Sequence, residues 1–143
     1  YFDWLTVGSG LEISGTSITS TMANSTVGDI LQSFADTERA SAGTSYVKIK
    51  EIQVPKTGTL RIKFDLKSSG GGNTNGRIYR NAVAVGTVQV DSDAVYTTYS
   101  EDISGWTVGD LCQLYIQEVA VAGAAKNFRI YEAVPIDYIV NTD

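Results

Sequence analysis

The stretch Leu60-Arg61-Ile62-Lys63-Phe64-Asp65-Leu66-Lys67 decides the fold class of this chain. Apolar and charged residues alternate along it without a break. A period of two points one row of side chains into a core and the other row toward water, which is typical of a β-strand with one buried face. The sequence therefore predicts a strand whose apolar row is buried and whose charged row faces outward.

Three other segments alternate in the same way, namely Cys112–Gln117, Phe128–Tyr131 and, less regularly, Val83–Val85. Together with the first stretch they predict the contents of the core. The residues expected to be buried are Leu60, Ile62, Phe64, Leu66, Cys112, Leu114, Ile116, Phe128 and Ile130. The side chains expected to face outward are Arg61, Lys63, Lys67, Gln113 and Arg129.

Turn residues separate the apolar runs about every 8–12 residues, which is typical of an antiparallel sandwich or barrel of short strands. A chain of 143 residues suits one such domain. We predict an all-β domain over residues 29–143, preceded by an N-terminal arm and linker over residues 1–28. In the arm, Leu11–Ser14 and Ser17–Ser20 flank Gly15-Thr16, so this segment is predicted to form a β-hairpin.

Local patterns predict the course of individual segments. Asp29–Ala40 is expected to form a strand, although the spacing of its apolar residues also fits a helix. The apolar residues of Tyr46–Val54 change parity, which predicts a β-bulge near Lys50-Glu51. A turn at Pro55–Gly58 is predicted to make this strand and Leu60–Lys67 the two arms of one hairpin.

Residue types also predict a loop, a turn and the last strand. Ser68–Gly76 is rich in glycine and asparagine and is interpreted as a solvated hairpin tip. Arg80-Asn81-Ala82 is expected to form a tight turn, because asparagine tolerates positive φ. Ile136–Val140 is expected to form the last strand.

The composition argues against several classes of function. The chain has no histidine, so it lacks the commonest general base and metal ligand, and its net charge of −5 argues against a nucleic-acid partner. Cys112 occupies an inward position and is interpreted as a small buried hydrophobe. No apolar run approaches the roughly 20 residues that span a bilayer, so no membrane partner is expected. We therefore expect no catalytic residues, no cofactor and no transition metal.

A calcium site is not excluded by the composition, because carboxylate oxygens are plentiful at Asp91, Asp93, Glu101 and Asp102. A solvated turn is the alternative interpretation of Asp91-Ser92-Asp93. The chain begins with Tyr1 and not with methionine, so we expect either a processed chain or a piece of a longer polypeptide.

Aromatic residues offer a candidate binding surface. Trp106, Tyr115 and Tyr131 are predicted to face a ligand, and parity places the two tyrosines in an outward stripe. The rings that are candidates to stack on sugars are these three together with Trp4, Tyr79, Tyr96 and Tyr99. Ordinary cross-strand pairing of aromatics is the simpler interpretation of the same residues, and a subunit contact is a further alternative.

Several segments resemble known structural proteins. Gly8–Ile18 resembles the GxGLxISGTxI hairpin of phage tail-fibre and other virion-surface proteins. Tyr46–Asp65 and Arg77–Thr87 look like strands of jelly-roll-type domains in phage and prophage structural proteins, although Ala82 stands where the turn usually has glycine. Gly109–Tyr115 is similar to the GDxIQLY strand of such domains. The resemblance covers most of the chain.

This resemblance implies a jelly-roll-like β-sandwich and a noncatalytic role at the virion surface, as capsid decoration or as part of a tail or head fibre. Other virion proteins would be its partners, and self-association, as a trimer in particular, is expected. An arm with strand pattern but little core can add strands to a neighbour. The expected assembly contacts are Leu5, Val7, Leu11, Ile13 and Ile18. The alternative hypothesis is a carbohydrate- or receptor-binding module that uses the exposed aromatics.

Overall fold

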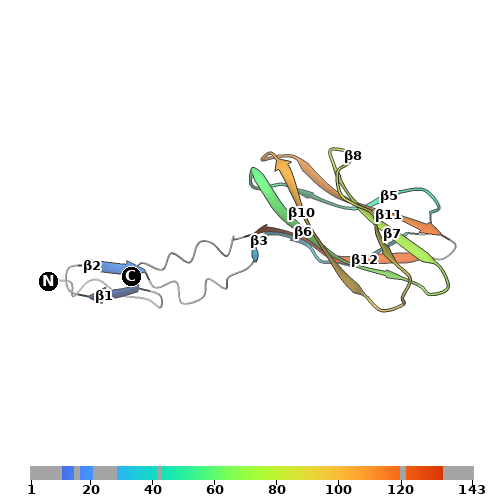
Figure 1. Cartoon of the computed structure of the whole chain (residues 1–143), viewed down its shortest axis with the longest axis horizontal. Coiled ribbons are helices and arrows are strands. Elements are labelled where there is room, and N and C mark those ends of the chain that lie inside the picture. Colours follow the sequence, from blue (N-terminus) through green and yellow to red (C-terminus); the bar gives the residue numbers. More distant parts are fainter. Residues whose placement is uncertain (1–10, 15–16, 21–28, 42, 120–121, 134–143) are drawn as a thin grey trace. The chain divides into compact units, whose positions relative to one another are not determined.

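The computed structural model describes residues 11–14, 17–20, 29–41, 43–119 and 122–133. In the N-terminal segment, β1 (Leu11–Ser14) pairs antiparallel with β2 (Ser17–Ser20), with Leu11 opposite Ser20 (Figure 1). The predicted hairpin is therefore confirmed. Its turn, the Ile136–Val140 strand, and Leu5 and Val7 lie outside the described residues, as do the side chains of Leu11, Ile13 and Ile18. The boundary between residues 28 and 29 stays a prediction.

From residue 29 onward, two five-stranded antiparallel sheets form a sandwich (Figure 1). The first, called the β6 sheet, contains β3 (Asp29–Ala35), β4 (Arg39–Ser41), β6 (Gly58–Ser68), β10 (Thr97–Trp106) and β12 (Gly123–Ala133). The second, called the β11 sheet, contains β5 (Val47–Gln53), β7 (Asn73–Arg80), β8 (Val83–Ala84), β9 (Gln89–Asp91) and β11 (Leu111–Val119). The described residues contain no helix, so the predicted all-β antiparallel sandwich is confirmed.

The core lies between the two sheets. Every residue predicted to be buried is buried, and the apolar row of β6 contributes from Leu60 to Leu66. Phe64 packs beside Tyr99, with ring centroids 5.9 Å apart. Neighbouring strands add further buried side chains that the alternation alone did not single out. These are Ile52, Val54, Ile78, Ile103, Trp106, Ala124 and Ala125.

Two predicted hairpins are wrong, because the chain changes sheet at each of them. β5 pairs with β11, whereas β6 pairs with β10 and β12, so Pro55–Gly58 carries the chain across the sandwich. Ser68–Gly76 likewise connects β6 to the start of β7 in the other sheet. The physical reason is that an apolar row faces the core in either arrangement, whether the next strand pairs beside it in the same sheet or lies across the core in the other sheet. Periodicity therefore identifies the strand but not its partner.

Other local predictions are confirmed. Asp29–Ala40 begins with strand β3 and contains no helix. A β-bulge does interrupt β5, although it falls at Ile49, where the partners of β11 step from Lys50 to Lys48. The turn at Asn81-Ala82 has φ angles of 50° and 68°, as a tight hairpin between β7 and β8 requires.

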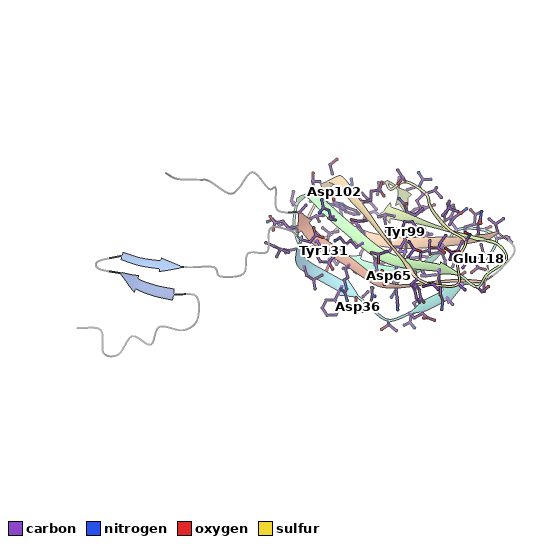
Figure 2. All side chains as sticks on the ribbon, turned by 60° about the horizontal axis from the view of Figure 1, so that its bottom comes forward. Asp36, Asp65, Tyr99, Asp102, Glu118 and Tyr131 are labelled. Atoms are coloured by element: carbon purple, nitrogen blue, oxygen red, sulfur yellow. The ribbon has the colours of Figure 1, made fainter. Side chains whose placement is uncertain are left out.

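The outward row of β6 is half-buried and ion-paired rather than freely solvated. Arg61 donates two hydrogen bonds to the Asp102 carboxylate, at 2.6 and 2.8 Å, and a third to Asp29 at 2.7 Å. Lys63 also pairs with Asp29. Figure 2 labels Asp102 at the same end of the sandwich as Tyr131, whose ring lies below the Lys63 ammonium at 5.1 Å. These contacts tie β3, β6, β10 and β12 together across the outer face of the sheet.

We predict that this network makes the fold sensitive to acid. Burial raises the pKa of Asp29, but its bonds to Lys63 and Arg61 outweigh burial and lower it overall. Hydrogen bonding from Arg61 lowers the pKa of Asp102. A carboxylate whose pKa is lower in the folded chain stabilises the fold above its unfolded pKa, near 3.9, and that contribution disappears as pH falls through the folded pKa. Urea midpoints should therefore stay level from about pH 7 to pH 5 and fall below about pH 4.

The matched variant for this prediction is Asp102→Asn, which removes one titrating partner of Arg61. Its urea midpoint should fall less steeply below about pH 4 than that of the unchanged chain. A midpoint that rises toward acid in the unchanged chain would contradict the assignment.

Candidate functional site

The outer face of the β11 sheet gathers three tyrosines. Tyr115 on β11 and Tyr79 on β7 point outward because Leu114, Ile116 and Ile78 point into the core. Tyr46 precedes the first residue of β5. We call this surface the tyrosine face, and it consists of Tyr46, Tyr79 and Tyr115 with Asn75, Gln113 and Gln117.

The three rings form one continuous cluster. Tyr79 stacks on Tyr115 with centroids 4.0 Å apart and an interplanar angle of 28°. Tyr46 lies 6.2 Å from Tyr79 at 52°, within the range of favourable aromatic contacts. All three side chains are half-buried, so each ring keeps part of its surface accessible. Burial raises the pKa of Tyr46, and the nearby Tyr79 raises it further. The phenol of Tyr46 therefore stays protonated, as a hydrogen-bond donor, at neutral pH.

Amide side chains surround the rings and are held by hydrogen bonds. Asn75 donates to the Gln117 side-chain oxygen at 3.3 Å, and Gln117 donates to the backbone carbonyl of Thr44 at 2.9 Å. Gln113 accepts from the backbone N–H of Ala82 at 2.8 Å and donates to Glu51 at 2.7 Å. Asn75 and Gln117, which are half-buried, therefore hold their amide groups in place on this face before any ligand arrives.

Gln113 was predicted to face water and instead is only 4% exposed. Its parity is outward, as expected. The side chain is nevertheless covered, because its amide bridges the turn after β7 and Glu51 on β5. Alternation gives the side of the sheet on which a residue lies but not what covers it there.

Charged residues border the rings. Tyr115 lies in register between Lys48 on β5 and Arg77 on β7. Lys48 forms an ion pair with Glu51 at 2.7 Å, and Arg77 donates to the backbone carbonyl of Gly86 at 2.7 Å. The ion pair raises the pKa of Lys48 and lowers that of Glu51. Both groups therefore stay charged across neutral pH.

The predicted ligand-facing aromatics do not form one site. Trp106 is 1% exposed, so its prediction as a ligand-facing residue is wrong. The last position of β10 turns its indole into the core, and the Arg80 guanidinium covers the ring at 4.4 Å. Tyr131 lies on β12 of the β6 sheet, so it shares no stripe with Tyr115.

The sequence analysis did not name Tyr46 as a candidate ring, and it counted Tyr79 only among the rings able to stack on sugars, not among the ligand-facing residues. Both follow turn-rich segments, and only the register between β5, β7 and β11 brings them beside Tyr115. The available signal was the outward parity of Tyr79 within Arg77–Tyr79.

The carboxylates considered for calcium are bound to donors of the protein itself. Asp91 accepts the backbone N–H of Asp93 at 2.8 Å and the Tyr99 hydroxyl at 3.2 Å. Glu101 receives one backbone N–H on both oxygens, and Asp102 holds the arginine of the neighbouring strand. Within the described residues, no three acidic or cysteine side chains gather as a metal site would require.

Cys112 is buried, as expected, and burial raises the pKa of its thiol. A thiol held protonated in this way is a poor nucleophile. No helix in the described residues is long and apolar enough to cross a membrane.

No protein-family model and no curated protein matches this sequence. Among solved structures, the CBM36-1 domain of a multidomain xylanase, from the hindgut metagenome of Trinervitermes trinervoides, has a TM-score of 0.54 at 9% identity, over 76% of this chain and 91% of that chain. The likeness is one of fold. It supports the β-sandwich architecture and assigns no residue.

Two further structures are less similar. The insecticidal delta-endotoxin Cry8Ea1 of Bacillus thuringiensis gives a TM-score of 0.49 at 10% identity, over 68% of this chain and 20% of that chain. A carbohydrate-binding module CBM36 in complex with calcium and xylotriose gives a TM-score of 0.46 at 17% identity, over 70% of this chain and 91% of that chain.

Proposed function

We propose that this chain is a noncatalytic β-sandwich module that binds carbohydrate on its tyrosine face. The observation that carries the proposal is the cluster of Tyr46, Tyr79 and Tyr115, with the hydrogen-bonded amides of Asn75 and Gln117 on the same face of the sheet. A sugar ring presents C–H groups on its faces and hydroxyls at its edge. Aromatic rings can stack on the C–H groups, and amide side chains can form hydrogen bonds with the hydroxyls.

The shape of the site favours an extended ligand. The rings lie on the outer face of one sheet, in which β5, β11 and β7 are adjacent strands. A glycan chain can lie across such a surface with successive sugars on successive side chains. Hydrogen bonds within the protein, such as that from Asn75 to Gln117, reduce the ordering cost of binding.

The fold comparison supports this proposal over the virion-surface hypothesis. The solved structure with a TM-score of 0.54 is a domain named CBM36-1 of a xylanase. The virion role, the virion partners, the trimer and the location at a particle surface rest on the sequence resemblance alone and stay predictions.

The test is a binding screen on a glycan array, followed by calorimetry with the best ligand. We expect Tyr79→Ala to weaken binding about tenfold, roughly 1.4 kcal/mol, because this ring contacts both of the others. Tyr79→Phe should retain most of the affinity, since it keeps the stacking surface. Tyr131→Ala is the matched control, because Tyr131 is a half-buried tyrosine on the opposite sheet.

Three outcomes would contradict the proposal. They are the absence of any retained glycan, an equal loss of binding in Tyr131→Ala, and the release of cleaved oligosaccharide during incubation. The last would show a catalytic activity that the tyrosine face does not explain.

A further inference from the structure

A hollow of about 270 Å³ opens at the edge of the sandwich beside β5. Its walls come from the end of β3, the segment leading into β4, and the bulged part of β5. It is smaller than the roughly 300–1,000 Å³ of typical drug-sized ligand pockets, so it suits a small group. The lining residues are Ala35, Thr37, Arg39, Ile49, Lys50 and Glu51.

Two cations converge on this hollow. Lys50 is only 7% exposed, because the bulge at Ile49 turns it into the sandwich opposite Leu114. Its ammonium donates to the backbone carbonyl of Ala35 at 2.8 Å and to that of Thr37. An ammonium has three N–H donors, so one remains for another acceptor. Arg39, the first residue of β4, supplies a second positive charge from the opposite sheet.

The neighbouring carboxylates are already paired with other side chains. Asp36 receives two hydrogen bonds from Arg129, each of 2.8 Å. Glu51 binds Lys48 and Gln113, each at 2.7 Å. Among the described residues, neither cation of the hollow forms an ion pair of its own. The hollow therefore has uncompensated positive charge.

The electrostatics of Lys50 agree with this arrangement. Burial lowers the pKa of its ammonium, the Arg39 charge lowers it further, and Asp36 opposes both without cancelling them. A bound anion would add the missing negative charge and raise that pKa again.

We propose that this hollow binds an oxyanion group, with the free N–H of Lys50 and the Arg39 guanidinium as its donors. The group is a carboxylate or a sulfate, carried either by a free ion or by an acidic sugar. The site is distinct from the tyrosine face, since none of the three tyrosines lines the hollow, although Glu51 at its rim accepts a hydrogen bond from Gln113 of that face.

The test is calorimetry on the full chain with sodium sulfate, sodium glucuronate and methyl glucoside, at constant ionic strength set with chloride. We expect saturable binding of sulfate and glucuronate and none of methyl glucoside. Arg39→Gln should weaken sulfate binding about tenfold, the loss of one charge-assisted hydrogen bond. Arg39 is exposed, so this variant should fold. Arg77→Gln is the matched control: Arg77 does not line the hollow, so sulfate binding should stay unchanged.

A second measurement follows the Lys50 side chain by NMR. Its pKa should rise when sulfate saturates the hollow, whereas the pKa of Lys48 should stay constant.

The proposal is overturned if neither anion binds saturably, if Arg39→Gln binds sulfate as well as the unchanged chain does, or if the pKa of Lys50 does not rise. Binding of sulfate without glucuronate assigns the hollow to a free ion, and binding of both assigns it to an acidic sugar as well. Loss of glycan binding in Tyr79→Ala with sulfate binding intact separates this site from the tyrosine face.

Discussion

Replacing Phe64 with alanine is expected to lower the free energy of unfolding by about 3–5 kcal/mol, the largest effect of any substitution considered for this chain. Phe64 is 2% exposed at the centre of the core. Its ring packs beside Tyr99 and against Gly76, where an added Cβ atom would come within 2.9 Å of it. The variant therefore loses the transfer energy of the ring and leaves a cavity between β6 and β7.

The matched control is Phe34→Ala. Phe34 lies on β3, and its side chain is 62% exposed. The same chemical change there should cost less than about 1 kcal/mol, because it removes little buried surface. Urea unfolding followed by tryptophan fluorescence measures both variants. Equal losses in the two variants, or a fully stable Phe64→Ala, would show that the register of β6 is wrong.

The second large effect is expected from Gly123→Ala. A Cβ atom at Gly123 would lie 2.3 Å from Oγ1 and 2.4 Å from Cγ2 of Thr74, closer than van der Waals contact allows. Gly123 and Thr74 are both buried, and they come from opposite sheets. The added methyl group must therefore push β12 and β7 apart. We expect a loss of about 1–3 kcal/mol, typical of overpacking in a dense core.

A double-mutant cycle isolates the cause of this loss. Thr74→Ala removes the two nearest atoms, Oγ1 and Cγ2, and leaves only its Cβ atom at 2.9 Å, so the double variant should recover much of the stability lost in Gly123→Ala. Thr74→Ala alone should cost little, since the hydroxyl is buried and has no hydrogen-bond partner among the described residues. Additive losses in the double variant would show that Gly123 is required for another reason.

Alternation in the sequence was enough to predict the longest regular strands, β6 and β11, and the apolar row of each. Alternation from Leu60 to Lys67 is a local property, set by which side of the pleat each residue occupies, so it predicted the burial of Phe64 and Ile62 correctly. The tight turn at Asn81-Ala82 was also predictable, because φ preference belongs to the residues themselves. The bulge in β5 was visible as a change of parity, to within one residue.

The tertiary structure alone decided which strands pair and what covers each side chain. Local pattern could not show that Pro55–Gly58 changes sheet, because a row of apolar residues is buried equally well beside a partner or across the core. It could not place Tyr46 and Tyr79 beside Tyr115, since that proximity depends on the register of three strands far apart in sequence. It also could not show that Trp106 is buried, because the Arg80 side chain that covers its ring comes from another strand. Both proposed sites are built from such long-range contacts, whereas periodicity reports only the nearest neighbours along the chain.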